Sequence, residues 1–183
     1  MAELFDSFPS LQNDRIIIRK MEEKDVDALT QITDNSNVYR YIPPFLYKKS
    51  KGNLLAAIRN LGGRDFDKKK MIISGIYLCQ NPDFLVGLAE MFDYKKSASR
   101  ITIGYRINEA YWRQGIATNA VHLMVQYLSS VGIHTIQAFV MPENAHSVKA
   151  LQKNGFQKED ALVQEKNWGG QDIVNVEVYT YRI

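Results

Sequence analysis

The chain has 183 residues, 45% of them hydrophobic, and contains 23 Lys and Arg against 20 Asp and Glu. This length suffices for one folded domain with a sizeable core, and no Pro/Gly/Ser-rich linker divides it, so we expect a single domain over residues 1–183. The net charge of +3 is too small to indicate nucleic acid as a partner, and no apolar run is long enough to cross a membrane.

Residues 1–14 carry acidic side chains and no basic region, unlike a signal peptide, so we expect a cytoplasmic protein. The single cysteine, Cys79, cannot form an internal disulfide and is most simply a small core residue. The three histidines, His122, His134 and His146, are scattered, so the sequence predicts no metal site.

The N-terminal part of the chain combines one strand signal with two helix signals. The β-branched run at residues 15–19 predicts a strand, and the apolar spacing over residues 22–32 predicts a helix. Residues 39–44 contain two prolines and interrupt regular structure. A second helix should end at Gly62, before charged residues 64–70 that we expect to form a loop. Its apolar face contains Leu54, Leu55, Ile58 and Leu61.

Three strands should follow as an antiparallel meander. Residues 71–79 and 84–92 have strand composition, and residues 80–83 supply the Pro and Asp of a turn between them. A polar loop at residues 94–100 then leads to a third strand at residues 101–107.

The segment that organises the rest of the chain begins with a long helix from about residue 117 to Gly132. Its helically spaced apolar residues are Ala117, Ala120, Val121, Met124, Val125, Leu128 and Val131. Residues 135–140 then predict a strand, residues 144–154 a helix, and residues 174–181 a last strand. A strand, a helix and a second strand in this order imply a parallel pair joined by a right-handed crossover, so a mixed α/β fold is indicated.

The turn before the long helix is a candidate anion site. Residues 112–117 would direct successive backbone N–H groups toward a ligand that lies at the positive end of the helix dipole. Gly115 would let that ligand approach the backbone closely. A phosphate group would suit that position. The same residues could also be an ordinary helix start.

This turn resembles the acetyl-CoA-binding motif of the GNAT superfamily of N-acetyltransferases, usually written Q/R-x-x-G-x-G/A. The match runs from Trp112 to Ala117, and Trp112 stands where the motif has Gln or Arg. The reading YWRQGIATNA over residues 111–120 is closer to the RimJ/RimL-like branch, whose members often read Y-W-G-x-G-Y-A-T-E-A.

A second similarity lies downstream at the usual distance. Asn144 and Ser147 are followed by Leu151, Lys153, Gly155 and Phe156, a pattern similar to the family's second signature. The order of the expected elements also resembles this fold over residues 15–181. The resemblance implies an acyl-CoA N-acyltransferase fold: a mixed central sheet with an antiparallel N-terminal meander and one splayed parallel pair, flanked by helices.

The resemblance implies acetyl-CoA as the cofactor and assigns residues to it. Backbone donors to the pyrophosphate would come from Gln114, Gly115, Ile116, Ala117 and Thr118. Arg113 would be a flanking cation, and Lys149 could approach the 3′-phosphate, although helix-surface lysines are usually only solvated. Asn144 could cap its helix and also meet the pantetheine amides. Pantetheine would pair with the backbone of the preceding strand, at Tyr105, Arg106 and Ile107.

Acetyl transfer to an amine also needs a proton acceptor and a proton donor. Glu90 lies on the strand next to residues 101–107, the strand expected to hold acetyl-CoA. It is our candidate base, and the alternative is a solvated carboxylate. Ser147 is the candidate acid, as in RimL-like members, because Leu151 stands where many acetyltransferases have a Tyr. The alternative for Ser147 is a first-turn serine that only satisfies a helix N–H. Thr102 stands where many RimJ/RimL-like sequences carry an acidic residue.

The resemblance therefore implies an N-acetyltransferase that uses acetyl-CoA and a primary amine as acceptor. We expect the acceptor to be a protein N-terminal α-amino group, with a polyamine, an aminoglycoside or another small amine as alternatives, and no nucleic-acid or membrane partner. The enzyme could be a monomer or a homodimer. A rival class is a non-catalytic acyl-CoA-binding module, which a thiol-release assay would separate. A dinucleotide-binding oxidoreductase is not favoured, because no G-x-G-x-x-G follows a strand.

Overall fold

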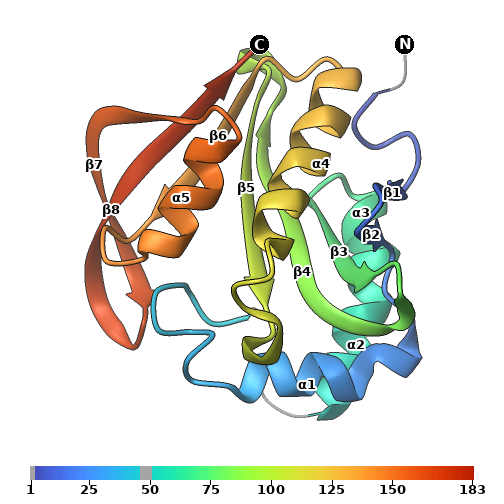
Figure 1. Ribbon diagram of the computed structural model, residues 1–183. Coiled ribbons are helices and arrows are strands. Elements are labelled where there is room, and N and C mark those ends of the chain that lie inside the picture. The colour runs from blue at the N-terminus through green and yellow to red at the C-terminus, as the bar shows by residue number, and fades with distance from the viewer. Residues whose placement is uncertain (1–2, 46–50) are drawn as a thin grey trace.

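The computed structural model describes residues 3–45 and 51–183 (Figure 1). Within these residues, eight strands form one sheet in the order β1-β2-β3-β4-β5-β6-β8-β7. The strands are β1 (Leu11–Gln12), β2 (Ile16–Arg19), β3 (Met71–Leu78), β4 (Asn81–Lys95), β5 (Arg100–Ile107), β6 (Thr135–Val140), β7 (Gln157–Trp168) and β8 (Gln171–Arg182). Among these strands only β5 and β6 pair in parallel. The predicted mixed sheet, with its meander and one parallel pair, is confirmed.

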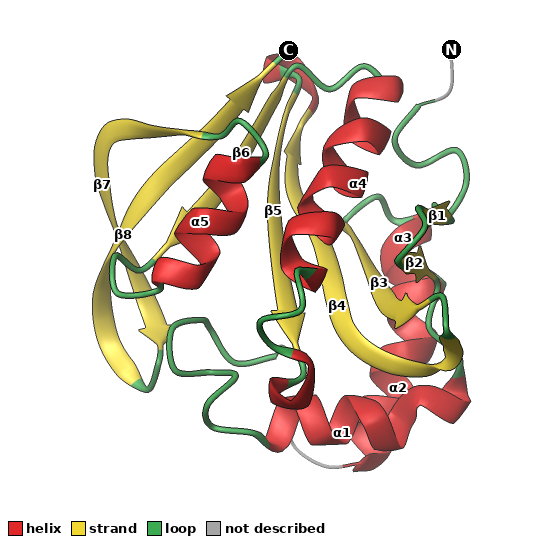
Figure 2. Cartoon of the chain, viewed as in Figure 1, coloured by secondary structure: helices red, strands yellow, loops and turns green. Residues whose placement is uncertain are grey.

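Helices lie on both faces of the sheet (Figure 2). One face, here called the α1–α2 face, packs against α1 (Val26–Asp34) and α2 (Lys51–Gly62). The opposite α4–α5 face packs against α4 (Ile116–Ser130) and α5 (Ala145–Lys153). The shorter helices are α3 (Arg64–Asp67) and three 3-10 turns, η1 (Glu23–Asp25), η2 (Lys96–Ala98) and η3 (Glu109–Tyr111). In the described part of the chain, no helix is both long and apolar enough to span a membrane.

The alternation of side chains along β4 and β5 assigns residues to the two faces. Ile101 and Ile103 of β5 belong to the same buried cluster as the apolar residues of α4, whereas Leu88 of β4 belongs to the cluster formed by α1 and α2. Because successive side chains of a strand point to opposite faces, Tyr105 shares the α4–α5 face and Arg106 the α1–α2 face. The sequence had left this phase open.

The expectation of a loop over residues 64–70 is wrong in part, because α3 forms a single helical turn there. Hydrogen bonds from Asp67 N to Gly63 O at 2.9 Å and from Lys68 N to Arg64 O at 3.0 Å close the turn. It places Phe66 against Phe8, with ring centroids 5.1 Å apart. Burial of this aromatic side chain, which depends on the distant N-terminal segment, explains why the charged composition misled the prediction.

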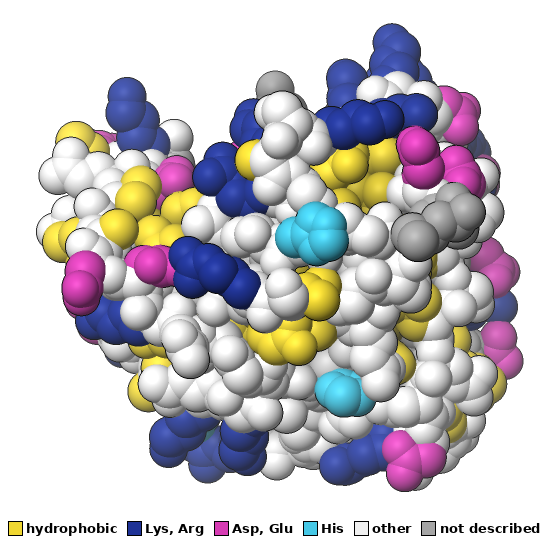
Figure 3. Space-filling view, turned by 90° about the horizontal axis from the view of Figure 1, so that it is seen from above, with side chains coloured by type: hydrophobic (Ala, Val, Ile, Leu, Met, Phe, Trp, Pro, Cys, Tyr) yellow, Lys and Arg dark blue, Asp and Glu magenta, His cyan; other side chains and the backbone are white. Residues whose placement is uncertain are grey.

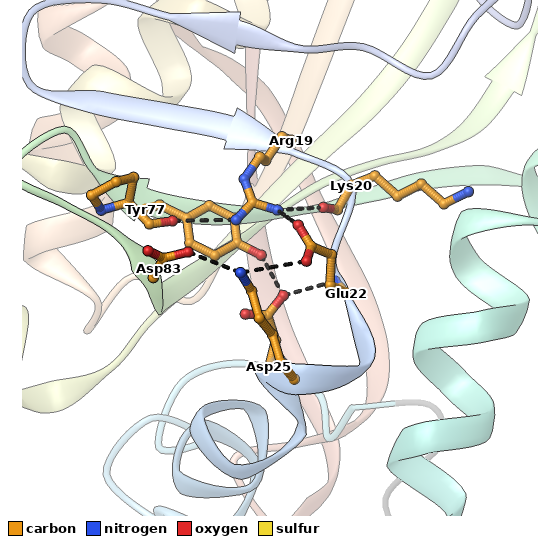
Figure 4. Close-up of polar contacts among 8 residues, drawn as sticks. Arg19, Lys20, Glu22, Asp25, Tyr77 and Asp83 are labelled. Atoms are coloured by element: carbon orange, nitrogen blue, oxygen red, sulfur yellow. Dashed lines mark hydrogen bonds and ion pairs between the residues drawn. The ribbon is translucent and has the colours of Figure 1, made fainter.

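A buried polar contact joins β2, β3 and η1 (Figure 4). The hydroxyl of Tyr77 donates to Asp25 Oδ2 at 2.6 Å, and the guanidinium of Arg19 lies 3.9 Å from the centre of the Tyr77 ring. Asp25 Oδ2 also accepts from the backbone N–H of Glu22 at 2.8 Å. Burial raises the pKa of Tyr77, and the Asp25 carboxylate raises it further. Because Asp25 is also the N-cap of α1, these contacts tie the start of α1 to β2 and β3.

Candidate active site

The loop between β5 and α4 presents an open helix N-terminus. Gly115 is the N-cap of α4 with φ of 75°, a left-handed conformation that glycine adopts without strain. The N–H groups of Ile116, Ala117 and Thr118 precede the first helical hydrogen bond, which runs from Asn119 N to Gly115 O at 3.1 Å. The first turn of α4 contains no acidic side chain. The positive end of the helix dipole therefore has free donors and no carboxylate of its own to neutralise it.

The other residues assigned to the cofactor lie around this helix terminus. Arg113 is exposed in the loop with φ of 62°, and the side chain of Gln114 turns back toward Ala110 O at 3.5 Å. The carbonyl of Thr118 accepts from Asn154 Nδ2 at 3.0 Å, which ties α4 to the end of α5. Lys149 is exposed on α5.

Arg15, to which no sequence motif pointed, holds the loop from the other side. Its Nη2 donates to Gln114 O at 3.0 Å, and its Nη1 lies 3.5 Å from the position that a Cβ on Gly115 would occupy. Next to it, Asn13 Nδ2 donates to Asn119 Oδ1 at 2.8 Å. A cavity of about 190 Å³ lies beside these contacts. Arg15 and Gln114 are 99 residues apart, so no local pattern could have paired them.

Trp112 connects the same loop to the end of β5. Its indole N–H donates to the carbonyl of Ile107 at 2.8 Å, although 40% of the residue is exposed. The tryptophan that departs from the usual motif thus braces the loop against the strand that precedes it. The only sequence signal for this contact was that Trp112 stands where the motif has Gln or Arg.

The strands β5 and β6 separate before either one ends. Their parallel pairing covers only Arg100 to Thr102 of β5. The hydrogen bond from Asn108 N to Val86 O, at 2.9 Å, sets the phase of the antiparallel β4–β5 pair. By this phase the backbone groups of Tyr105 and Ile107 turn toward β6, whereas those of Arg106 turn toward β4. Tyr105 therefore presents a backbone N–H and C=O that no described strand pairs on that side, and the diverging ribbons are visible in Figure 1.

Two residues to which the sequence gave separate tasks meet across this fork. The hydroxyl of Tyr105 lies 2.6 Å from Ser147 Oγ and 3.3 Å from Ser147 O, in the first turn of α5. Burial raises the pKa of Tyr105 to about 12, although its hydrogen bond with Ser147 acts in the opposite direction. Asn144 is the N-cap of α5, and its Oδ1 accepts from the N–H of Ser147 at 3.4 Å. The Asn144 cap and the Tyr105 contact together fix the position of Ser147.

Glu90 and Arg106 form an ion pair on the opposite face of the sheet. Arg106 Nε donates to Glu90 Oε1 at 2.5 Å, and the two side chains are 6% and 10% exposed. The guanidinium also donates from Nη1 to Pro43 O at 2.6 Å. Burial would lower the pKa of Arg106, but the Glu90 carboxylate and Tyr39 together outweigh it and the net shift is upward. The second oxygen, Glu90 Oε2, lies 3.5 Å from the position that a Cβ on Gly104 would occupy, so it faces the donor strand at a residue without a side chain.

Residues 35–45, between α1 and α2, are held by three different elements. Arg106 holds Pro43, and its guanidinium lies 5.6 Å from the ring centre of Phe45. Glu109 of η3 accepts hydrogen bonds from Asn35 Nδ2 at 2.7 Å and Asn37 Nδ2 at 2.9 Å. These two bonds hold the pKa of Glu109 below its usual range.

The third contact comes from the turn between β7 and β8. The N–H of Gly169 donates to Ile42 O at 3.2 Å, and a Cβ on Gly169 would lie only 2.4 Å from Arg40 O. Seen from above, a notch opens beside the β7–β8 hairpin, and Lys and Arg side chains flank it (Figure 3). The hairpin thus contacts the 35–45 segment at its tip, while the C-terminal half of β8 pairs with β6 in the sheet.

A family model described as an acetyltransferase (GNAT) domain matches residues 15–157. The N-acetyltransferase p20 of Bacillus licheniformis, whose activity is uncharacterised, is 30% identical over 156 residues, which is 84% of this chain and 85% of the relative.

Two solved structures have similar folds. RimL, a ribosomal L7/L12 alpha-N-protein acetyltransferase in complex with coenzyme A, superposes with a TM-score of 0.82 at 17% identity over 96% of this chain and 98% of that chain. The microcin C7 self-immunity acetyltransferase MccE, in complex with acetyl-CoA and AMP, gives a TM-score of 0.80 at 18% identity over 93% and 94% of the two chains.

Proposed function

The chain belongs to the acetyltransferase (GNAT) family, and we propose that it transfers the acetyl group of acetyl-CoA to the α-amino group of a protein. The observation that carries this proposal is the open N-terminus of α4 next to the unpaired backbone edge of Tyr105. Both features suit one elongated ligand with an anionic end and an amide-containing arm. When bound, acetyl-CoA supplies an activated acetyl thioester.

On the donor side, the chain offers complementary groups to each part of that ligand. The N–H groups of Ile116 to Thr118 would bind the pyrophosphate, with the side chains of Arg113 and Arg15 as nearby cations. The N–H and C=O of Tyr105 would pair with the pantetheine amides as an added strand would. Asn144 would be a further partner from the start of α5, and Lys149 could reach the 3′-phosphate.

On the acceptor side, Glu90 is the group that we assign to the proton of the amine. Arg106 occupies Oε1, so Oε2 beside Gly104 would accept this proton, directly or through a water molecule. Arg106 would then serve the acceptor side and not the cofactor, since it orients Glu90 and holds Pro43. Ser147 lies across the sheet from this pair, where it would donate to the departing sulfur.

The likeness in fold to RimL, whose acceptor is a protein α-amino group, supports the choice of acceptor. The hydrogen bond from Gly169 to Ile42 links the hairpin tip to the 35–45 segment, and we expect these two loops to border the acceptor amine.

The test is acetyl-CoA-dependent thiol release measured with N-terminal peptides, polyamines and aminoglycosides. We expect turnover with peptides that carry a free α-amino group and none with the same peptides after N-terminal blocking. Turnover restricted to polyamines or aminoglycosides would refute the acceptor assignment. Acetyl-CoA binding without thiol release for any acceptor would favour a non-catalytic acyl-CoA-binding module.

A further inference from the structure

The contact between Tyr105 and Ser147 spans the gap that opens where β5 and β6 part. Tyr105 lies three residues beyond Thr102, the last residue of β5 that pairs with β6. Its side chain points to the α4–α5 face. Its hydroxyl reaches the first turn of α5 and lies 2.6 Å from Ser147 Oγ. The contact therefore joins β5, which would hold acetyl-CoA, to α5, which carries Ser147, the candidate hydrogen-bond donor to the leaving sulfur.

The direction of this hydrogen bond decides what Ser147 can do. Either oxygen could be the donor in this contact, and the Tyr105 hydroxyl also has Ser147 O as an acceptor at 3.3 Å. A phenol is a stronger acid than an aliphatic alcohol, and Ser147 Oγ is much nearer than Ser147 O, so we assign the Tyr105 hydrogen to Oγ. When Tyr105 donates to Ser147 Oγ, the single hydrogen of the serine hydroxyl is left to point elsewhere. The backbone N–H of Ser147 donates to Asn144 Oδ1 at 3.4 Å, which holds the residue in place, and the Tyr105 contact occupies one side of Oγ.

The order of the two pKa values argues against Tyr105 as the net source of a proton for the leaving thiolate. The pKa of Tyr105 is raised to about 12 by burial, whereas an ordinary thiol has a pKa of about 8.5. Transfer from the phenol to the thiolate would run uphill by roughly three pKa units, a factor of about a thousand in equilibrium. A hydrogen bond to the thiolate, with the proton retained by the hydroxyl, does not meet this penalty.

We propose that Tyr105 is a positioning residue that turns the hydroxyl of Ser147 toward the departing sulfur, so that Ser147 stabilises the thiolate by a hydrogen bond. This inference rests on the proposed function. In the transfer step the C–S bond of the thioester breaks, a C–N bond forms, and the amine proton passes to Glu90 or water. The thiolate then takes a proton from solvent, and Tyr105 and Ser147 keep theirs.

The test is a double-mutant cycle on kcat with Tyr105→Phe, Ser147→Ala and the combined variant. Tyr105→Phe should lower kcat about tenfold, the order of one charge-assisted hydrogen bond, and leave the Kd for acetyl-CoA unchanged. In the Ser147→Ala background the same change should have no further effect on kcat, because Tyr105 acts only through Ser147. Additive losses would contradict the proposal, and so would unchanged kcat in Tyr105→Phe.

Tyr127→Phe is the matched control, because the Tyr127 hydroxyl donates to Leu4 O at 3.0 Å, away from the fork. It should lower thermal stability without changing kcat. The phenylalanine ring fills the same space as the tyrosine ring in both variants, and thermal unfolding checks that each is folded. If the unaltered chain releases no thiol with any acceptor, the proposed function fails; if it does but Tyr105→Phe is as fast, only this inference fails.

Discussion

Arg106 and Glu90 are partners in one buried ion pair, although the sequence suggested a cofactor contact for the first and a catalytic base for the second. The pair lies between β4 and β5, on the face of the sheet opposite Tyr105, and Arg106 also holds Pro43. One guanidinium thus orients the candidate base and anchors the 35–45 segment. Variants of Glu90 therefore test catalysis, and variants of Arg106 test the stability of the fold.

Glu90→Gln should lower turnover at neutral pH by about a hundredfold with little change in acetyl-CoA affinity, because the amide keeps the shape but cannot take the amine proton. The measurement is kcat against pH together with calorimetric acetyl-CoA binding. Unchanged turnover at every pH would remove Glu90 from the mechanism and leave the proton to a water chain.

Arg106→Met should destabilise the fold by about 3–5 kcal/mol, because it leaves the Glu90 carboxylate buried without its partner. The combined variant Arg106→Met with Glu90→Leu should recover most of this loss, since no buried charge then remains. Urea unfolding of the single and combined variants measures both values. Equal losses in the two proteins would mean that Arg106 stabilises chiefly through Pro43 and the neighbouring rings.

Gly115→Glu should lower acetyl-CoA affinity by roughly a hundredfold or more, since a carboxylate at the helix N-terminus repels a pyrophosphate at a cost of several kcal/mol. The matched control is Gly170→Glu, because Gly170 has the same φ of 75° and open space around it. Both variants bear a similar backbone strain, but only the first should lose binding in calorimetry. Equal affinities would place the cofactor elsewhere.

Arg15→Ala should weaken acetyl-CoA binding about fivefold, the order of 1 kcal/mol for a cation at an anion site, and the loss should shrink as salt is added. Arg59→Ala is the control, because Arg59 is an exposed arginine paired with Glu23 on another part of the surface. The measurement is the acetyl-CoA affinity of each variant, by calorimetry at two ionic strengths. A salt-independent loss would indicate that Arg15 acts only by holding the loop at Gln114.

Glu109 should make stability depend on pH. Its pKa is lowered from 4.5 in the folded chain by hydrogen bonds from Asn35 and Asn37. The unfolded chain therefore binds the proton more readily, so this contribution is present above pH 4.5 and is lost as the pH falls through the lowered value. Glu109→Gln should reduce the fall in Tm between pH 7 and pH 3, whereas Glu143→Gln, at an exposed position, should not. The same fall in both variants would show that Glu109 is not the responsible group.

Sequence patterns determined the elements of this protein that depend on local spacing. The apolar period of α4, the cap at Asn144 and the glycine before Ile116 are properties of short segments, and the structure contains each where the pattern predicted it. The meander and the parallel crossover followed from the order of these elements, because connection rules leave few alternatives. The motif at residues 112–117 was recognisable for the same reason.

The tertiary structure alone decided which side chains share a space. Register between β4 and β5 placed Glu90 opposite Gly104 and diagonally next to Arg106 on the same face, and the separation of β5 from β6 brought Tyr105 to Ser147, 42 residues later in the chain. Arg15 reached the cofactor loop from 99 residues away. Contacts of this kind depend on the faces and distances that packing sets between strands and helices, and these are not encoded in the period of any one segment.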